Sequence, residues 1–260
     1  MKAMATSASD KSEFLDAVQK GLLLGAAVLA LVMPPTGWFQ RQIETPTAST
    51  TVAAPMAPMA PRNVQVRRVD FGSSKPTDDV RQLASWAVAT GDYQGKSFVI
   101  LDKKDARVYI FEPSGRLKAV TPVLLGYAIG DDNAPGIGTK PLSEIRPEER
   151  TTPAGRFVAE IGMNARGEDV VWVDYDAAVS MHRVLTTNPA ERRLERLATP
   201  THEDNRVSYG CINLPKAFYE DVLAPTVKKA GAIIYVLPET RPLHQVFGPM
   251  DSKALKVAQQ

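Results

Sequence analysis

The chain contains one cysteine, Cys211, in the segment Arg206-Val-Ser-Tyr-Gly-Cys-Ile-Asn-Leu-Pro215. Gly210 precedes it, and a residue without a Cβ permits unusual backbone conformations and leaves room beside the sulfur for a ligand. Residues 212–214 alternate apolar, polar and apolar side chains, which is typical of a short strand with one open face. The segment therefore predicts a single thiol on a rigid element at the end of a strand, where it could act as a nucleophile.

A lone cysteine can also be a small buried hydrophobe, so Cys211 alone does not identify a catalytic site. His182 is a second observation, because it lies in Ala178-Val-Ser-Met-His-Arg-Val184, an alternation typical of a neighbouring strand. A thiol becomes an efficient nucleophile when a nearby imidazole accepts its proton or stabilises the thiolate. Exported proteins usually pair or avoid their cysteines, and the N-terminal sequence described below predicts export. Together these features favour a Cys–His nucleophilic pair.

The residues around Cys211, with His182 upstream, resemble the signature of the L,D-transpeptidase catalytic domain. In that signature a histidine is followed, after a spacer, by Ser/Thr-His-Gly-Cys-hydrophobic-Asn, and the matching positions are Ser208, Gly210, Cys211, Ile212 and Asn213. Three more stretches resemble the family's opening hairpin, its Thr-Pro-x-Gly-x-Phe segment and its closing strand: Phe98–Lys103 with Ala106–Phe111, Thr151–Phe157, and Gly231–Leu237. The resemblance covers roughly residues 95–240.

The chain departs from the family signature at two places. Tyr209 stands where the family usually has a histidine. The spacer between His182 and Ser208 is longer than usual, polar and rich in arginine. We therefore expect a divergent member, in which Tyr209 stacks on the substrate or donates its hydroxyl in place of the missing ring.

The resemblance implies acyl transfer through a thioester. His182 would accept the proton of Cys211, and the thiolate would attack the carbonyl of the third residue of a peptidoglycan tetrapeptide stem, releasing the terminal D-Ala. An amine from a second stem would then resolve the thioester and form a cross-link. The N–H groups of Gly210 and Cys211 are the expected oxyanion donors, because they lie nearest the sulfur. In the family the carbonyl after the histidine, here that of Arg183, orients the imidazole.

The substrate pocket would be shaped by Ser208, Tyr209 and Asn213. Other readings of the same residues stay open. Water in place of the amine would make an L,D-carboxypeptidase. A catalytically silent module that binds the cell wall is a second alternative, favoured by Tyr209. A cytosolic cysteine hydrolase with a buried N-terminal helix is a third, which the proline-rich segment described next disfavours.

The first 76 residues have the layout of a membrane-anchored protein. Residues 1–20 form a polar tail, and residues 21–40 form an uncharged, largely apolar run. This run predicts an uncleaved signal-anchor in the inner membrane with a cytoplasmic N-terminus; a cleaved signal peptide and a buried core helix are the alternatives. Residues 41–76 are rich in Thr, Ala, Pro and Met without periodicity, which predicts an extended tether. We therefore expect the catalytic domain in the periplasm of the cell envelope.

Residues 77–240 are predicted to form the catalytic domain and residues 241–260 a C-terminal tail. A helix is expected between an N-cap at Thr77 and a stop at Gly91, and another over 215–223 that Pro225 ends or kinks. Strands are expected at 97–102, 106–111, 117–125, 155–162, 170–173 and 177–184. These patterns predict a mainly β protein, with an L,D-transpeptidase-like β-sandwich or barrel core and a few short helices.

Two segments between the expected strands could serve the site. Residues 126–150 form a long loop, which is suspected to be a flap over a cleft. The spacer helix expected at 189–197 should turn Leu194 and Leu197 inward. This helix carries three arginines, Arg192, Arg193 and Arg196. Either they form ion pairs with neighbouring glutamates, or one of them binds a substrate carboxylate.

Net charge and the few histidines argue against nucleic-acid binding, a metal site and a different catalytic base. A net charge of +2 predicts no affinity for nucleic acid. Three scattered histidines and one cysteine do not make a zinc site, so no metal or other cofactor is expected. His202 is the alternative base, but its polar loop is typical of a solvated side chain. His244 follows the last expected strand and should be structural or exposed.

Overall fold

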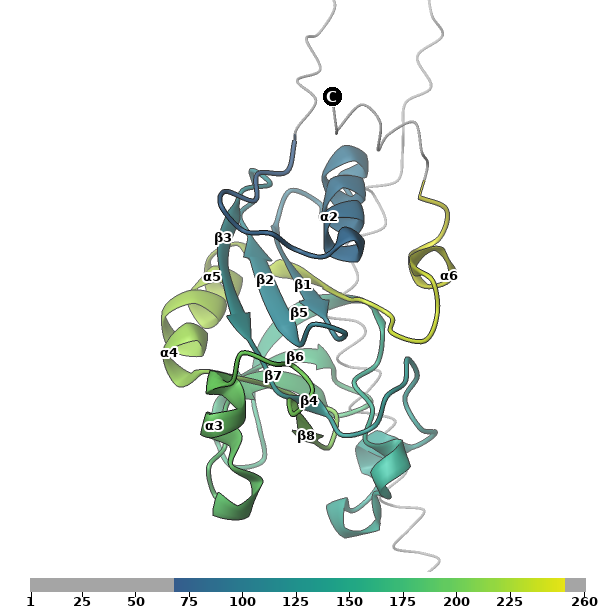
Figure 1. Cartoon of the computed structure of the whole chain (residues 1–260), viewed down its shortest axis with the longest axis vertical. Helices are drawn as coiled ribbons and strands as arrows, with labels where there is room; N and C mark the ends of the chain where they lie inside the picture. Colours follow the sequence, from purple (N-terminus) through teal and green to yellow (C-terminus); the bar gives the residue numbers. More distant parts are fainter. Residues whose placement is uncertain (1–67, 251–260) are drawn as a thin grey trace, which may run out of the picture. The chain divides into compact units, whose positions relative to one another are not determined.

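A computed structural model describes residues 68–250; the predicted signal-anchor and most of the predicted tether lie outside this range (Figure 1). The strands are β1 (Ser97–Asp102), β2 (Arg107–Phe111), β3 (Leu117–Pro122), β4 (Leu125–Gly126), β5 (Gly155–Met163), β6 (Asp169–Asp174), β7 (Val179–Arg183), β8 (Arg206–Ser208), β9 (Ile212–Leu214) and β10 (Ala232–Val236). The helices are α2 (Asp78–Thr90), α3 (Arg193–Ala198), α4 (Lys216–Phe218), α5 (Ala224–Ala230) and α6 (Leu243–Phe247). The mainly β fold predicted from the sequence is confirmed.

Eight strands form one sheet in the order β3-β2-β1-β10-β5-β6-β7-β9. Neighbouring strands are antiparallel except for β1 with β10 and β7 with β9. The sheet curls until its edges nearly meet. Leu124, just beyond β3, exchanges two backbone hydrogen bonds of 2.9 Å with Asn213 of β9. The parallel pair of β4 and β8 continues this seam, so the sheet forms the expected barrel-like core.

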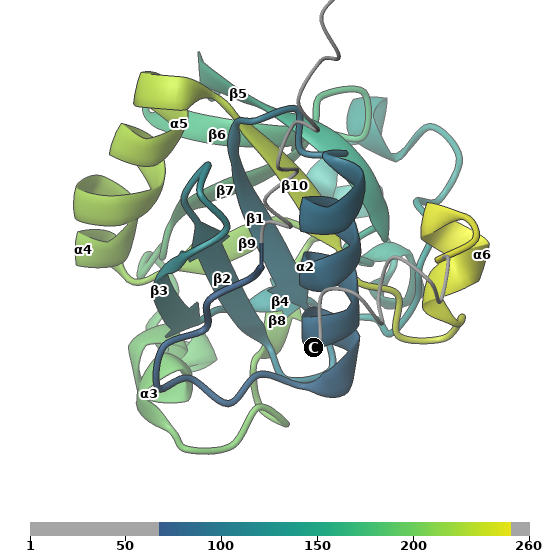
Figure 2. The same cartoon turned by 90° about the horizontal axis from the view of Figure 1, so that it is seen from above.

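The two faces of the sheet pack into separate hydrophobic clusters. In β1, Val99 and Leu101 enter the inner cluster, which includes side chains of the α4–α5 segment. Phe98 and Ile100 enter the outer cluster under α2. Figure 2 shows α2 on one side of β1 and β2, and α4 and α5 on the other. Since both faces are covered, β1 and β10 are buried along their whole length, which explains their nearly continuous apolar sequences.

Helix α2 lies where the sequence predicts it. Thr77 Oγ1 accepts the N–H of Val80 at 3.4 Å, and two aspartates occupy the first turn. Gly91 ends the helix with a φ of 72°, a left-handed conformation that favours glycine. The apolar face of α2 is buried in the outer cluster, which fixes the helix against β1.

The helix after β9 is longer than predicted. α4 runs into a π-helical turn at Tyr219–Leu223 and continues as α5 to Ala230. Pro225 lies in the first turn of α5, directly after this wider turn, where its missing N–H is tolerated. The sequence predicts that Pro225 ends or kinks the helix; the helix does not end there, and its winding changes in the turn directly before Pro225. Phe218, Val222 and Leu223 of this segment pack on the inner cluster.

The folded part extends beyond residues 77–240 at both ends. Phe71 packs edge-to-face on Phe111, with ring centroids 5.8 Å apart. Leu243 and Phe247 of α6 also join the outer cluster. Among residues 68–250, no helix is both long and apolar enough to cross a bilayer. The run at 21–40 that predicts an anchor lies outside these residues.

Candidate active site

Strands β7 and β9 bring the predicted catalytic residues onto one face of the sheet. Their parallel register pairs His182 with Asn213. The same register sets Ser180 beside Cys211, which directly precedes β9. Because successive side chains point to opposite faces, Met181 enters the inner cluster while its neighbours face away from it. The thiol and the imidazole are therefore diagonal neighbours on the outer face.

The imidazole of His182 is held by the backbone. Its Nδ1 lies 2.7 Å from the carbonyl oxygen of Arg183. A carbonyl only accepts hydrogen bonds, so Nδ1 carries the proton and Nε2 is the basic nitrogen. The side chain of Arg183 is engaged elsewhere, in 2.8 Å ion pairs with Asp169 and Glu220. Arg183 therefore contributes its carbonyl to the site, while its guanidinium joins the end of β7 to the neighbouring elements.

The sulfur of Cys211 has polar neighbours and is partly exposed. It lies 3.5 Å from the carbonyl oxygen of Ala178, to which the thiol donates, and 3.8 Å from Oγ of Ser180. Burial raises the pKa of the thiol, but the hydrogen bond and charge of His182, together with Ser180, lower it further than burial raises it. The net pKa of Cys211 is below its ordinary value, which favours the thiolate.

Ser208 and Asn213 hold the turn that carries Cys211. Ser208 Oγ donates to the carbonyl of Cys211 at 2.6 Å, and Asn213 Nδ2 donates to the same carbonyl at 3.2 Å. Both residues are buried. These two predicted substrate-binding residues thus shape the site by fixing the turn.

The two predicted oxyanion donors differ in their hydrogen bonding. The N–H of Gly210 donates to Ser208 Oγ at 3.1 Å, so it is already engaged. The N–H of Cys211 makes no hydrogen bond to any residue in the range 68–250. Of the two groups, the Cys211 N–H is the one free to stabilise charge that develops on a substrate oxygen.

Position 210 requires glycine for two reasons, its backbone conformation and the lack of room for a Cβ. Its φ is 126°, and a Cβ there would lie 2.7 Å from the carbonyl oxygen of Thr151. We expect Gly210→Ala to cost about 1–3 kcal/mol through the backbone conformation, with a further cost from the clash. The displaced turn should also slow alkylation of Cys211 by iodoacetamide.

The matched control is Gly167→Ala in the β5–β6 hairpin, where φ is 76° and no atom lies within 4 Å of the added Cβ. This control isolates the cost of the backbone conformation. Thermal unfolding and alkylation rates should be measured for both variants. If both variants lose the same stability and Gly210→Ala alkylates at the wild-type rate, the expected clash at position 210 is contradicted.

Thr152 connects the thiol turn to a buried ion pair. Its Oγ1 donates to the carbonyl of Gly210 at 2.8 Å and accepts the N–H of Gly126 at 2.9 Å. Its carbonyl accepts Nζ of Lys103 at 2.9 Å, and the same ammonium lies 2.8 Å from Asp131. The side chains of Lys103 and Asp131 are 0% and 1% exposed. Thr152, in the Thr-Pro-x-Gly-x-Phe segment, therefore links the turn before Cys211 to this ion pair.

The carboxylate of Asp131 is the centre of this network. Burial raises the pKa of Asp131, but hydrogen bonds from Lys103, Thr240 and the backbone of residues 239 and 240 hold it well below its usual range. Glu239 adds a second carboxylate 3.6 Å from Lys103 and pairs with Arg206. The network joins the end of β1, the start of the 126–150 loop and the segment after β10.

Tyr209 is covered by the loop at 126–150. The guanidinium of Arg150 lies over the Tyr209 ring, 4.0 Å from its centroid. Arg150 also donates to the carbonyl oxygen of Ile145. The Tyr209 side chain is still 38% exposed. Its ring therefore stacks on an arginine of the chain, and one edge stays open beside the site.

The same loop is anchored at a second place, near β6. Asn133 Nδ2 donates to Asp174 Oδ2 at 3.0 Å. Gly138 packs so closely that a Cβ there would lie 1.9 Å from the carbonyl oxygen of Asp176. In this structure the loop that the sequence suggests as a flap therefore contacts the segment around the end of β6 at two places.

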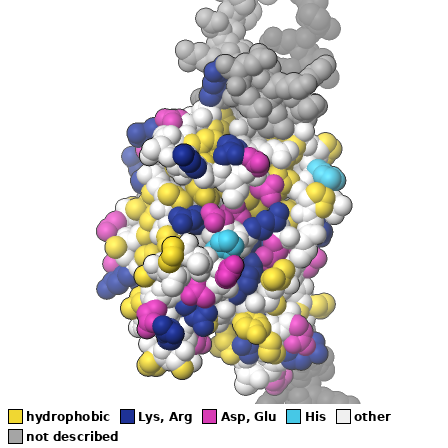
Figure 3. Space-filling model, viewed as in Figure 1, with side chains coloured by type: hydrophobic (Ala, Val, Ile, Leu, Met, Phe, Trp, Pro, Cys, Tyr) yellow, Lys and Arg dark blue, Asp and Glu magenta, His cyan; other side chains and the backbone are white. Residues whose placement is uncertain are grey.

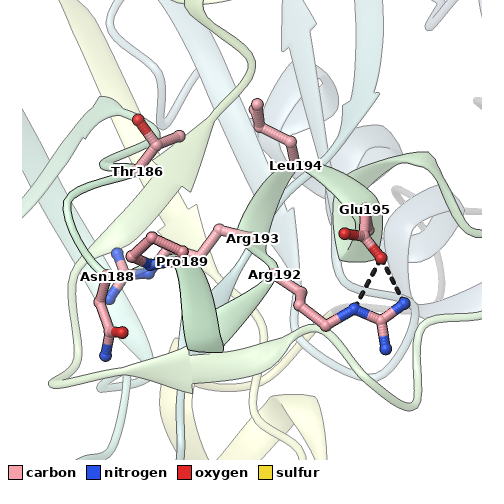
Figure 4. Close-up of a pocket in the computed structure, with 7 residues that line it drawn as sticks. All are labelled: Thr186, Asn188, Pro189, Arg192, Arg193, Leu194 and Glu195. Carbon is pink, nitrogen blue, oxygen red and sulfur yellow. Dashed lines mark hydrogen bonds and ion pairs between the residues drawn. The ribbon is translucent and has the colours of Figure 1, made fainter.

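The spacer arginines have different partners. Arg192 pairs with Glu195, and Figure 4 shows this pair on the side of α3 away from Arg193. Arg196 donates to two backbone carbonyls. Arg193 alone of the three contacts the catalytic segment, because its Nη1 donates to Oδ1 of Asn213 at 2.7 Å. This bond orients the Asn213 amide so that Nδ2 faces the Cys211 carbonyl.

A pocket of about 220 Å³ lies between α3 and the loop at 186–189 (Figure 4). Arg193 lines it, although its side chain is only 10% exposed and also pairs with Glu191. Leu197 is buried as predicted, but Leu194 is 58% exposed and lines the pocket. The inward prediction is wrong for Leu194, which lies in the first turn of a six-residue helix.

A larger cleft, of about 530 Å³, opens beside the thiol. Its walls are the turn at 138–139, the β5–β6 hairpin and the segment 175–178 between β6 and β7. Ala178, whose carbonyl accepts the Cys211 thiol, lies in the wall.

Sequence reasoning missed Ser180 and Ala178, which contact the thiol, and Trp172, which pairs with Ser180. Ser180 could have been found, because it lies two positions before His182 on the same strand and so shares its face. Trp172 pairs with Ser180 across β6 and β7. Ala178 carries no sequence signal, since its role comes from its carbonyl and from an unusual φ of 55°.

The other candidate groups lie apart from this chemistry. His202 is exposed beside Asp105, with 3.8 Å between Nδ1 and Oδ1, and makes no hydrogen bond to Cys211. His244 is exposed. Within residues 68–250, no group of three His, Cys, Asp or Glu side chains is placed to hold a metal. Figure 3 shows Lys and Arg interspersed with Asp and Glu on the face in view.

The fold and the site together define a mainly β protein with a Cys–His pair at the edge of a curled sheet. No protein-family model matches the chain, and no curated protein matches it in sequence. A structure of a cysteine-to-serine mutant of the Enterococcus faecium L,D-transpeptidase is similar over 55% of this chain and 50% of that chain, with 15% identity and a TM-score of 0.32. An L,D-transpeptidase from Xylanimonas cellulosilytica is similar over 55% of this chain and 60% of that chain, with 14% identity and a TM-score of 0.33. This chain therefore spans only part of each neighbour, and both TM-scores are low.

Proposed function

We propose that the protein is a cysteine-dependent acyltransferase, an L,D-transpeptidase that acts on tetrapeptide stems of peptidoglycan. The observation that carries this proposal is the register of β7 and β9, which places His182 and Cys211 on the same face of the sheet. There His182 lowers the pKa of the Cys211 thiol. The substrate class comes from the resemblance of the Ser-Tyr-Gly-Cys-Ile-Asn segment to the family signature.

The chemistry needs two proton transfers through one imidazole. Nε2 of His182 takes the proton of Cys211, and the sulfur attacks the carbonyl carbon of the third stem residue. The N–H of Cys211 stabilises the oxygen that becomes negative. The bond to the terminal D-Ala then breaks, and the imidazolium returns the proton to the leaving amine. A neutral amine then attacks the thioester carbonyl, Nε2 of His182 takes a proton from its nitrogen, and the C–S bond breaks, leaving the cross-link and the Cys211 thiolate.

Two alternatives use the same fold. Water as the acceptor would make the protein an L,D-carboxypeptidase. A silent module that binds the cell wall would keep the pocket without the chemistry, and the substitution of Tyr209 for the usual histidine favours it. The placement of His182 and Cys211 on one face of the sheet supports the enzyme over the silent module, because a binding module needs no such pair.

Acylation distinguishes the enzyme from the binding module. The family's thiols are acylated by carbapenems, so the intact mass of the wild-type chain should increase by the mass of one carbapenem molecule. Cys211→Ala should show no adduct. Cys211→Ser, which keeps nearly the same side-chain shape, is a second variant without the thiol. An equal adduct on the alanine variant, or none on the wild type, contradicts the proposal. Products from a muropeptide donor with and without an added amine then separate transferase from hydrolase.

The proposed setting is the periplasm, with the catalytic domain tethered to the inner membrane. Its support is the sequence alone, an apolar run at 21–40 followed by the proline-rich residues 41–76. Fractionation of cells that express the full chain and a chain lacking residues 1–40 tests this arrangement. The full chain should sediment with membranes and the shortened one should not.

A further inference from the structure

The long spacer between His182 and Ser208 reaches the turn that carries Cys211 through Arg193, the first residue of α3. Nη1 of Arg193 donates to Oδ1 of Asn213 at 2.7 Å, across 20 positions of the sequence. The Arg193 side chain is 10% exposed, and Asn213 is 1% exposed. A hydrogen bond from a charged donor is stronger than one between neutral groups, and more so where water is excluded. The spacer is therefore firmly joined to β9.

The neighbours of the Asn213 amide allow it one orientation. A guanidinium only donates hydrogen bonds, and a carbonyl oxygen only accepts them. With Oδ1 toward Arg193, the Nδ2 of Asn213 donates to the carbonyl of Cys211 at 3.2 Å. The reversed amide would place two donors together at Arg193 and two acceptors together at Cys211. Arg193 therefore selects the orientation in which Asn213 binds the nucleophile residue.

This amide ties the position of Cys211 to the sheet. The other donor to the Cys211 carbonyl is Ser208, at 2.6 Å, which belongs to the same turn. Asn213 is fixed independently, because its backbone N–H and carbonyl both bond to Leu124 at 2.9 Å. The sulfur and the N–H of Cys211 are carried by the same residue, so a rotation of its carbonyl moves both of them relative to His182.

The spacer holds Arg193 in place by contacts of its own. Arg196 donates to the backbone carbonyls of Glu191 and Asp204, which joins the segments before and after α3. Leu197 is buried. The Nε of Arg193 also pairs with Glu191. Arg193 thus approaches Asn213 from an anchored helix.

We propose that Arg193 is a positioning residue for the Cys211 thiol, supplied by the part of the chain that departs from the family pattern. It acts through Asn213 and does not touch the sulfur. The inference rests on the proposed function, because it concerns the nucleophile of that reaction. The sequence leaves open whether this arginine binds a substrate carboxylate, and its bonds to Glu191 and Asn213 favour the positioning role instead.

A series of substitutions at position 193 tests this role through alkylation of Cys211 by iodoacetamide. Lys keeps the donors and the charge, Met keeps the length without either, and Glu presents an acceptor that favours the reversed amide. The rate at neutral pH should fall about 2- to 10-fold in Arg193→Met, the usual effect of one hydrogen bond. It should fall further in Arg193→Glu and stay within about 2-fold of the wild type in Arg193→Lys.

The dependence of this rate on pH separates positioning from a loss of stability. A displaced Cys211 loses contact with His182, which lowers the pKa of the thiol. The midpoint should therefore rise in Arg193→Met and Arg193→Glu and return toward the wild-type value in Arg193→Lys. A folded variant that is merely less stable would keep its midpoint.

Arg193→Met also removes a positive charge, so two controls separate charge from position. Arg192→Met removes the neighbouring guanidinium, which pairs with Glu195, and should leave rate and midpoint unchanged. Asn213→Ala keeps Arg193 but breaks the link to the Cys211 carbonyl. In that background, Arg193→Met should change the rate by less than about 2-fold, because the two residues act through one contact. A full effect there would indicate charge alone and would overturn the inference.

Equal rates and midpoints in the Lys, Met and Glu variants would overturn it as well. This comparison needs no variant of the buried Asn213, so it stands if Asn213→Ala does not fold. Acylation by a carbapenem should follow the same order, with Arg193→Lys nearest the wild type. No adduct on the wild-type chain would contradict the proposed function, whereas the alkylation series would still decide the role of Arg193.

Discussion

Replacing His182 by Gln should lower kcat/KM for acyl transfer by about 10²- to 10⁴-fold, the usual contribution of a positioned general acid and base. Gln keeps much of the shape of the ring but cannot take up a proton. The variant should also change the titration of the nucleophile. In the wild-type chain, burial raises the pKa of Cys211 while His182 and Ser180 lower it further. With His182 removed, burial should prevail and the pKa should rise.

The measurement is the rate of alkylation by iodoacetamide as a function of pH. The midpoint should move to higher pH in His182→Gln, so the rate at neutral pH should fall because less thiolate is present. His202→Gln is the matched control, since that exposed side chain lies beside Asp105. A midpoint that stays in place in His182→Gln, or moves equally in His202→Gln, would show that the imidazole at 182 does not activate the sulfur.

Asp131→Asn should be the most destabilising single substitution of a polar group in the site's support. It leaves the ammonium of Lys103, which is 0% exposed, without its closest carboxylate. Removing one partner of a buried ion pair typically costs about 3–5 kcal/mol. For a chain of this size that corresponds to a Tm lower by roughly 6–20 °C. The neighbouring variant Asp132→Asn is the control, because Asp132 is 78% exposed and should change stability by about 1 kcal/mol or less.

The same carboxylate predicts a dependence of stability on pH. The pKa of Asp131 is lower in the folded chain than in the unfolded chain, where an aspartate titrates near about 3.9. Its contribution to the free energy of unfolding is therefore complete above that pH and is lost progressively as the pH falls toward the folded-state pKa. The gap in stability between the wild type and Asp131→Asn should narrow in acid. A gap that is constant from pH 7 to pH 3 would contradict this linkage.

The elements of the fold were largely readable from the sequence, because their signals are local. The cap at Thr77, the stop at Gly91 and the continuous apolar run of β1 each act within a few residues. The pairing of Cys211 with His182 was also accessible, since both lie on short alternating segments. The continuation of the helix through Pro225 was not readable, because the π-helical turn before it has no local sequence signal; its residues Tyr219 and Leu223 are buried in the inner cluster.

The hydrogen bonds and ion pairs that hold the site in place could not be predicted from the sequence, because their partners lie far apart in the chain. Lys103 stands in a polar turn and looks solvated, yet its ammonium contacts residues from 130 to 152. Similarly, Arg193 looked equivalent to the other spacer arginines until its bond to Asn213 was seen. The sequence does not distinguish a buried lysine or arginine from an exposed one. Burial of such a side chain is favourable only when its partners supply hydrogen bonds and opposite charge, and these partners are distant in the sequence.

The position of β10 has a consequence for folding during synthesis. This strand, the last of the sheet to be synthesised, lies in its middle, between β1 and β5. The sheet cannot be completed until residues 232–236 have entered it, and contacts this distant in sequence form slowly. A nascent chain that lacks residues 232–236 would therefore have an incomplete sheet. We expect its Cys211 thiol to reach full reactivity only after β10 has been inserted.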